Sequence, residues 1–216
     1  MIISPGRRYI FVHIPKTGGT SLATALEARA MKEDILIGDT PKARRRKARL
    51  AHLNARGRLW KHATLADIDG VLTPEDIGAM FTFTLIRNPW DRVVSYYHWL
   101  KVQSFDHPAV ALARDYDFKR FLQEPVVQQS LQASPARSYM QDIEGVERCN
   151  LYIRLEAFER DAAPLWDHLG FTLSLPHVNR SERPPQYAKA YDAQSRDLVA
   201  RLCAEDIARF GYVFGH

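Results

Sequence analysis

The chain of 216 residues contains only two cysteines and no long apolar run. Cys149 and Cys203 belong to no CxxC pair and to no Cys/His cluster at metal-ligand spacing, so neither a disulfide framework nor a zinc site is indicated. The apolar run near the N-terminus, YIFVHI, is too short for a signal peptide and far too short to span a bilayer. These absences predict a cytoplasmic protein without a membrane span.

The sequence also lacks internal repeats and low-complexity tracts. At 46% hydrophobic and 25% charged residues, the chain is long enough to bury one good core, so we expect a single domain over residues 1–216. The formal net charge of +5 indicates an anionic ligand or surface. Charge alone does not distinguish a nucleotide from a nucleic acid or a lipid headgroup.

Three apolar segments, RRYIFVHI, MFTFTLI and NLYIRLE, each lead into a helical pattern. After the first, Leu22 and Leu26 recur at helical spacing behind a Thr/Ser opening, and after the second, Asn88 is placed to cap a helix. The third precedes a helix that ends at Gly170. Three strand-to-helix units predict an α/β fold, P-loop-like, with three α/β/α layers and a central parallel sheet.

Two more helices have clear ends. Thr73 and Pro74 are typical of an N-cap and a first helical position. The segment DAQSRDLVARLCAEDIARFGYVF has apolar residues along one face, as in a helix that ends before Gly211.

The turn after the first predicted strand, PKTGGTS, combines a lysine, two glycines and three hydroxyl side chains. Glycines let the backbone approach a bulky anion, and the N–H groups of the first helical turn point at it with the positive end of the helix dipole. The turn differs from the Walker A pattern GxxxxGK[ST], because its lysine precedes the glycines. We therefore predict a site for a phosphate-like group rather than an ATPase triphosphate, and the alternative is a plain tight turn. The residues of the predicted site are Lys16, Thr17, Gly18, Gly19, Thr20 and Ser21.

A second candidate anion site follows the second predicted strand. Arg87 stands at the end of that strand, and Ser95 lies about two helical turns further on. Both side chains can bind one anion if the helix runs back along the sheet. The alternative is that Arg87 pairs with an acid and Ser95 packs against a neighbour.

The two motifs together resemble those of the sulfotransferases that use 3′-phosphoadenosine-5′-phosphosulfate (PAPS). HIPKTGGTSL is similar to their 5′-phosphosulfate loop and LIRNPWDRVVSYYHW to their 3′-phosphate segment, with further likeness in RLEAFERD, LPHVNRS and DIARFGYVF. The nearest likeness is to the carbohydrate branch that includes heparan sulfate 2-O-sulfotransferase. The resemblance implies that residues 16–21 hold the 5′-phosphosulfate, that Arg87 and Ser95 hold the 3′-phosphate, and that Arg180 and Ser181 border the nucleotide.

The resemblance also implies an enzyme that moves a sulfuryl group from PAPS to a hydroxyl of a saccharide or another small acceptor. In-line attack needs charge stabilisation at the leaving phosphate, for which Lys16 is the candidate, and no metal is required. The acceptor needs a base, and His62 occupies the region where members like the 2-O-sulfotransferase carry their catalytic histidine. His13 is the rival, although it can equally be a packed residue of the sheet.

Two other functions remain open from the sequence. The lysine and glycine-rich turn also fits a P-loop small-molecule kinase, although the motif order is wrong and no Walker B aspartate stands out. The basic block at residues 41–61 also fits a nucleic-acid or anion-binding module, but it offers only Trp60 for stacking on bases, so we expect no nucleic-acid partner. The acceptor, the oligomeric state and the role of residues 42–49 are not readable from the sequence.

Overall fold

A computed structural model of the chain describes residues 1–175 and 186–216. It divides into two compact units, of which the first comprises Met1–Ile86 with Ala136–Asn179 and the second comprises Arg87–Pro135 with Arg180–His216. The first unit contains the β-sheet, and the described residues of the second unit form helices and their connections. The single domain over residues 1–216 stays a prediction.

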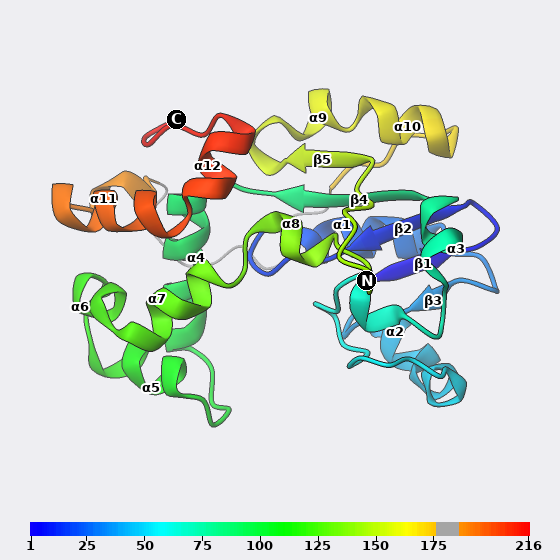
Figure 1. The fold of residues 1–216 in the computed structure, drawn as a ribbon, viewed down its shortest axis with the longest axis horizontal. Coiled ribbons are helices and arrows are strands. Elements are labelled where there is room, and N and C mark those ends of the chain that lie inside the picture. Colours follow the sequence, from blue (N-terminus) through cyan, green and yellow to red (C-terminus); the bar gives the residue numbers. More distant parts are fainter. Residues whose placement is uncertain (176–185) are drawn as a thin grey trace. The chain divides into compact units, whose positions relative to one another are not determined.

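The sheet of the first unit has five strands in the order β3-β1-β2-β4-β5 (Figure 1). The sequence predicts three of these strands, β2, β4 and β5. They are parallel to one another, which confirms the predicted α/β class with a parallel sheet. Tyr9 lies opposite Phe81, and Phe83 lies opposite Leu151. The short strands β1 and β3 were not predicted, and β1 is antiparallel to both of its neighbours. The strands are β1 (Ile2–Ser4), β2 (Tyr9–Val12), β3 (Ile35–Leu36), β4 (Phe81–Ile86) and β5 (Leu151–Arg154).

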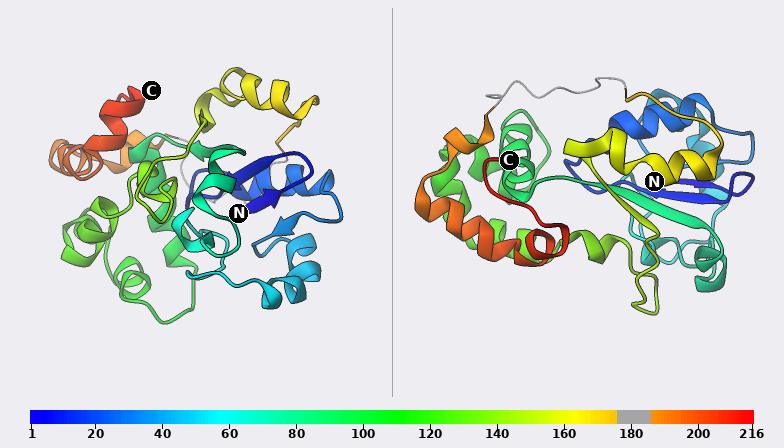
Figure 2. Two further views of the ribbon diagram at one scale, coloured as in Figure 1. Left: turned by 45° about the vertical axis from the view of Figure 1, so that its right-hand side comes forward. Right: turned by 90° about the horizontal axis from the view of Figure 1, so that it is seen from above.

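The two faces of the sheet are covered by different elements, because strand side chains alternate between faces. Tyr9 and Phe11 belong to a cluster with Leu22 of α1, and Ile10 and Val12 belong to a cluster on the other face. Helices α1 (Gly19–Ala28), α9 (Phe158–Asp161) and α10 (Ala163–Leu169) cover the first face, and Figure 2 shows α9 and α10 in yellow beside the sheet. The second face is covered by η2 (Ala66–Ile68), α3 (Pro74–Gly78) and the segment that begins with α8 (Ala136–Tyr139) and continues to Met140. The remaining elements of this unit are α2 (Pro41–Arg46), η1 (Lys47–His52) and η3 (Leu155–Ala157).

Helix α4 (Pro89–Lys101) forms the centre of the second unit. Its buried residues Trp90, Val93 and Tyr97 pack against Phe121 and Val199, so the buried aromatic residues of α4 belong to a core. The helix predicted before Gly211 is in fact two helices separated at Cys203, and Asp206 of the second lies 3.9 Å from Arg92 of α4. The other elements are α5 (Pro108–Asp115), α6 (Phe118–Gln123), α7 (Pro125–Gln132), η4 (Tyr187–Ala190), α11 (Ala193–Leu202) and α12 (Ala204–Phe210).

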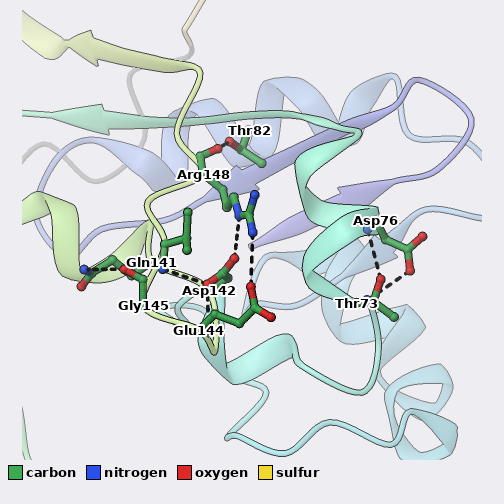
Figure 3. Close-up of polar contacts among 9 residues, drawn as sticks. Thr73, Asp76, Thr82, Gln141, Asp142, Glu144, Gly145 and Arg148 are labelled. Carbon is green, nitrogen blue, oxygen red and sulfur yellow. Dashed lines mark hydrogen bonds and ion pairs between the residues drawn. The ribbon is translucent and has the colours of Figure 1, made fainter.

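Several helix ends lie where the sequence predicts them. Thr73 caps α3, and its hydroxyl accepts a hydrogen bond from the N–H of Asp76 while the Asp76 carboxylate accepts one from the N–H of Thr73 (Figure 3). The Asn88 side chain accepts a hydrogen bond from the N–H of Trp90 at the start of α4. Gly170 ends α10 with φ of 73°, a backbone conformation that glycine adopts without strain.

A buried ion pair fixes the segment that leads into β5 (Figure 3). The Asp142 carboxylate, only 2% exposed as a residue, accepts hydrogen bonds from Nε of Arg148 at 2.6 Å and from the N–H groups of Glu144 and Val146. Burial alone would raise the pKa of Asp142, but these hydrogen bonds outweigh it and lower the pKa. The Thr82 hydroxyl of β4 donates to the Arg148 carbonyl, so the segment is attached to the sheet.

Candidate active site

The loop that joins β2 to α1 has an unusual backbone. Lys16 has φ of 67° and Gly18 has φ of 85°, so both adopt the left-handed conformation within three residues. For a lysine this conformation costs about 1–2 kcal/mol, which the surrounding contacts must offset. The Thr17 hydroxyl, which is buried, donates a hydrogen bond to the Ile14 carbonyl at 2.9 Å and holds the turn together. The loop is therefore a fixed, strained turn at the carboxyl end of a parallel strand.

The N-terminus of α1 is not capped by a side chain. The predicted Thr/Ser opening is wrong in detail, because Gly18 is the N-cap residue and Thr20 and Ser21 lie within the first turn of the helix. The first turn also contains no acidic residue. The first turn of α1 therefore carries no carboxylate of its own that would neutralise the positive end of the helix dipole, which is the arrangement that anion sites use.

Both glycines of the turn are in close contact with neighbouring side chains. A Cβ atom on Gly19 would lie 2.1 Å from Cδ2 of His13, and one on Gly18 would lie 2.8 Å from Cδ1 of Leu155. Real Cβ contacts are not this short, so neither position accepts a side chain without a shift of its neighbour. The sequence explains the glycines by the approach of an anion, but it gives no sign of these two contacts.

His62 lies beside the loop. Its Nδ1 is 2.7 Å from the backbone carbonyl of His13, the residue that follows β2. A carbonyl oxygen only accepts, so Nδ1 of His62 must carry the proton and Nε2 is left as the acceptor nitrogen. Burial lowers the pKa of His62 to about 4, with a further contribution from Lys61, although the hydrogen bond to the His13 carbonyl acts in the opposite direction. His62 is therefore neutral near pH 7, with a lone pair on Nε2.

His13 is a packed residue rather than an exposed one. It is 7% exposed, and its ring lies 4.6 Å from the ring of His62 and against Gly19. Burial, with a smaller contribution from the charge of Lys61, holds the pKa of His13 well below its usual value. The structure thus places both candidate histidines and the glycine-rich turn in one cluster of the first unit.

Arg87 of the second unit lies two residues before α4, Ser95 lies on α4, and Asp91 stands four residues from each of them. The Asp91 carboxylate accepts hydrogen bonds from Nε of Arg87 at 2.7 Å and from Nη2 at 2.6 Å. Ser95, four residues further along, is buried at 4% exposure. A pairing of Arg87 with an acid was the alternative interpretation of this motif from the sequence. The i,i+4 spacing of Arg87 and Asp91 would have indicated Asp91 as that acid. The pair orients the guanidinium group at the start of the helix.

Two predicted nucleotide contacts, Arg180 and Ser181, lie outside the described residues. Within residues 1–175 and 186–216, no group of three or more histidine, cysteine or acidic side chains is arranged to hold a metal ion. In the same part of the chain, no helix is both long and apolar enough to cross a membrane.

Comparison with known proteins identifies the family. The model of the sulfotransferase family matches residues 1–213, which is nearly the whole chain. No curated protein sequence matches, and one solved structure that is similar is the mouse sulfotransferase SULT7A1 complexed with PAP, at 15% identity and a TM-score of 0.36. That alignment covers 95% of this chain and 67% of the mouse chain. The family match favours the transferase over the kinase and the binding module: the chain belongs to the sulfotransferase family and is a transferase enzyme.

Proposed function

We propose that the enzyme transfers the sulfuryl group of PAPS to a hydroxyl group of an acceptor, a saccharide or another small molecule. The observation that carries this proposal is the cluster in the first unit: an uncapped helix N-terminus, a glycine-rich turn with Lys16, and a neutral His62 within one network of contacts. The family supplies the type of reaction.

The 5′-phosphosulfate is assigned to the turn at residues 16–21. The N–H groups at the start of α1 present the positive end of the helix dipole, and the Lys16 ammonium adds a full charge. Charge on the leaving phosphate oxygen grows as the bond to sulfur breaks, so these donors stabilise the transition state more than the ground state. Thr17 acts on the turn itself, because its hydroxyl donates to the Ile14 carbonyl.

His62 is assigned as the base. The acceptor oxygen forms a bond to sulfur, its proton passes to Nε2 of His62, and the phosphate oxygen of the nucleotide leaves with the electron pair of the bond that breaks. The hydrogen bond from His62 to the His13 carbonyl supports this role, because it keeps the proton on Nδ1 and fixes the orientation of the imidazole ring. Nε2 then remains as the nitrogen that can accept a proton. His13 is the weaker candidate, since its ring is packed beneath Gly19 and is only 7% exposed as a residue.

The 3′-phosphate of the nucleotide is assigned to Arg87 and Ser95. Asp91 accepts hydrogen bonds from the Arg87 guanidinium and fixes its orientation, which supports the assignment of Arg87 to an anion site. Arg180 and Ser181 are assigned to the border of the nucleotide on the family resemblance alone. This scheme uses no metal, because the transferred group carries less charge than a phosphoryl group.

Calorimetric titration with adenosine 3′,5′-bisphosphate, in the absence of magnesium, tests the nucleotide site. We expect micromolar or tighter binding by the wild type, a loss of at least tenfold in Arg87→Ala and in Lys16→Ala, and much weaker binding of ATP. Arg120→Ala is the matched control, because Arg120 also pairs with an acid four residues further on, Glu124. Equal binding of ATP and the bisphosphate, or unchanged affinity in both variants, contradicts the proposal.

A further inference from the structure

Leu155 is a half-buried leucine whose side chain lies against the proposed phosphosulfate turn. It follows β5 directly as the first residue of η3, and it belongs to the same unit as the turn. The three heavy atoms nearest to a Cβ atom on Gly18 would be Cδ1, Cδ2 and Cγ of Leu155, at 2.8, 3.3 and 3.6 Å. The branched end of the leucine side chain therefore covers the backbone of Gly18.

The hydrophobic core does not explain this leucine. Among the described residues, Leu155 belongs to neither of the apolar clusters on the two faces of the sheet, whereas Leu151 and Leu169 pack against the cluster that contains Leu22. Leu155 lies instead at the carboxyl end of one parallel strand and touches a loop at the carboxyl end of another. This edge is where parallel sheets of α/β proteins bind their ligands, so Leu155 belongs to the site.

Gly18 depends on its neighbours for its conformation. Its φ is 85°, and its carbonyl accepts a hydrogen bond from the N–H of Ser21 at the start of α1. Glycine adopts many other backbone conformations at little cost, so contacts with other residues must select the left-handed one. Leu155 contacts Gly18, and the His13 ring contacts Gly19, the next residue. The two side chains together restrict both glycines of the turn.

An ion pair fixes the segment that carries Leu155. The Asp161 carboxylate of α9 accepts hydrogen bonds from Nε and Nη2 of Arg154 at 2.6 and 3.2 Å, and Nε of Arg160 adds another at 2.9 Å. The side chain of Asp161 is only 11% exposed, and these bonds, above all that from Arg154, lower its pKa to about 2. Arg154 immediately precedes Leu155 and Asp161 ends the helix that follows it, so the pair closes the segment between them into a loop.

We propose that Leu155 is a positioning residue of the anion site: held by the Arg154–Asp161 ion pair, it keeps Gly18 left-handed, so that the N–H groups at the start of α1 face the 5′-phosphosulfate. Leu155 acts through the turn and does not touch the reacting atoms. The inference rests on the proposed function, because it takes the turn at residues 16–21 as the site of that group. A smaller side chain at position 155 leaves space beside Gly18. The turn then gains conformations that bind no anion, and the population of the competent one falls.

Two ligands separate this role from a direct contact with the nucleotide. Adenosine 3′,5′-bisphosphate places a phosphate in the turn, whereas adenosine 3′-phosphate has none to place there. In calorimetric titrations at pH 7.5, we expect Leu155→Ala to raise the dissociation constant of the bisphosphate at least fivefold and that of adenosine 3′-phosphate less than twofold. Leu155→Met keeps an apolar side chain of similar size and should stay within threefold of the wild type for both ligands. Asp161→Asn weakens the ion pair and should raise the bisphosphate constant at least twofold.

The matched control is Leu169→Ala, which truncates another half-buried leucine of the same unit, one that packs against the core. It should lower the free energy of unfolding and leave both dissociation constants unchanged, and circular dichroism shows whether each variant is folded at the temperature of titration. The proposal is overturned if Leu155→Ala leaves the bisphosphate affinity unchanged, if it weakens both ligands by the same factor, or if Asp161→Asn has no effect. It is also overturned if Leu169→Ala weakens the bisphosphate as much as Leu155→Ala does. Failure of the wild type to bind the bisphosphate refutes the proposed function itself, which separates the two failures.

Discussion

The contact between Gly19 and His13 makes a sharp prediction about the turn. Alanine at position 19 would place its Cβ 2.1 Å from Cδ2 and 2.6 Å from Nε2 of His13. The His13 ring has little room to retreat, because it is buried and in contact with the ring of His62. Overpacking of this kind costs about 1–3 kcal/mol, so we expect Gly19→Ala to lower the free energy of unfolding by that amount.

A double-mutant cycle measures this effect by urea unfolding at pH 7.5. In a His13→Ala background the clash is absent, and Gly19→Ala should be neutral or slightly stabilising, because alanine favours the helical conformation. Gly38→Ala is the control, since its Cβ would meet only the Cβ of Ala43 at an ordinary 3.8 Å. The reasoning fails if Gly19→Ala has the same effect in both backgrounds or resembles Gly38→Ala.

Two further predictions concern buried titratable groups. The pKa of His62, about 4, lies below the usual 6.5, so the unfolded chain binds a proton more readily than the folded one. The free energy of unfolding should therefore fall as the pH falls from 6.5 towards 4, by about 3 kcal/mol in total. In urea unfolding, His62→Gln should lose less stability than the wild type between pH 7.5 and pH 5. Arg148→Met leaves the buried Asp142 carboxylate without its cation and should lower the free energy of unfolding by about 3 kcal/mol at pH 7.5. The additional substitution Asp142→Asn removes the carboxylate charge and should restore part of that loss. If it restores none, the unpaired charge is not the cause.

The parts of the fold that follow from local sequence were predictable. The parallel strands β2, β4 and β5 are apolar runs next to helix signals, and Thr73, Asn88 and Gly170 act as the caps that their residue types favour. The short strands β1 and β3 escaped prediction because two or three residues carry too little periodicity to be recognised. The break at Cys203 was missed because the apolar pattern continues through it.

The site divides in the same way. The glycine-rich turn and Arg87 are visible in sequence because their residue types and their position after a strand are unusual together. Two contacts of the site have no sequence signal. In the first, the His13 ring lies against the backbone of Gly19. In the second, the His62 side chain donates a hydrogen bond to the backbone carbonyl of His13, far away in the chain. Asp91 is the exception, since helical spacing from Arg87 would have revealed it.

The partner of His62 is a backbone carbonyl, and this choice fits the chemistry of the proposed site. A carboxylate at Nδ1 would also fix the ring, but it would raise the pKa of His62 and place a negative charge near the phosphosulfate. The His13 carbonyl orients the ring without a net charge, so the field of Lys16 and the α1 dipole remains available to the anion. Bound anion would in turn raise the pKa of His62 from about 4, and the base would become stronger when the nucleotide is present. The same carbonyl belongs to His13, which lies two residues before the glycine-rich turn, so one short stretch of backbone contacts the proposed base and leads into the proposed anion site.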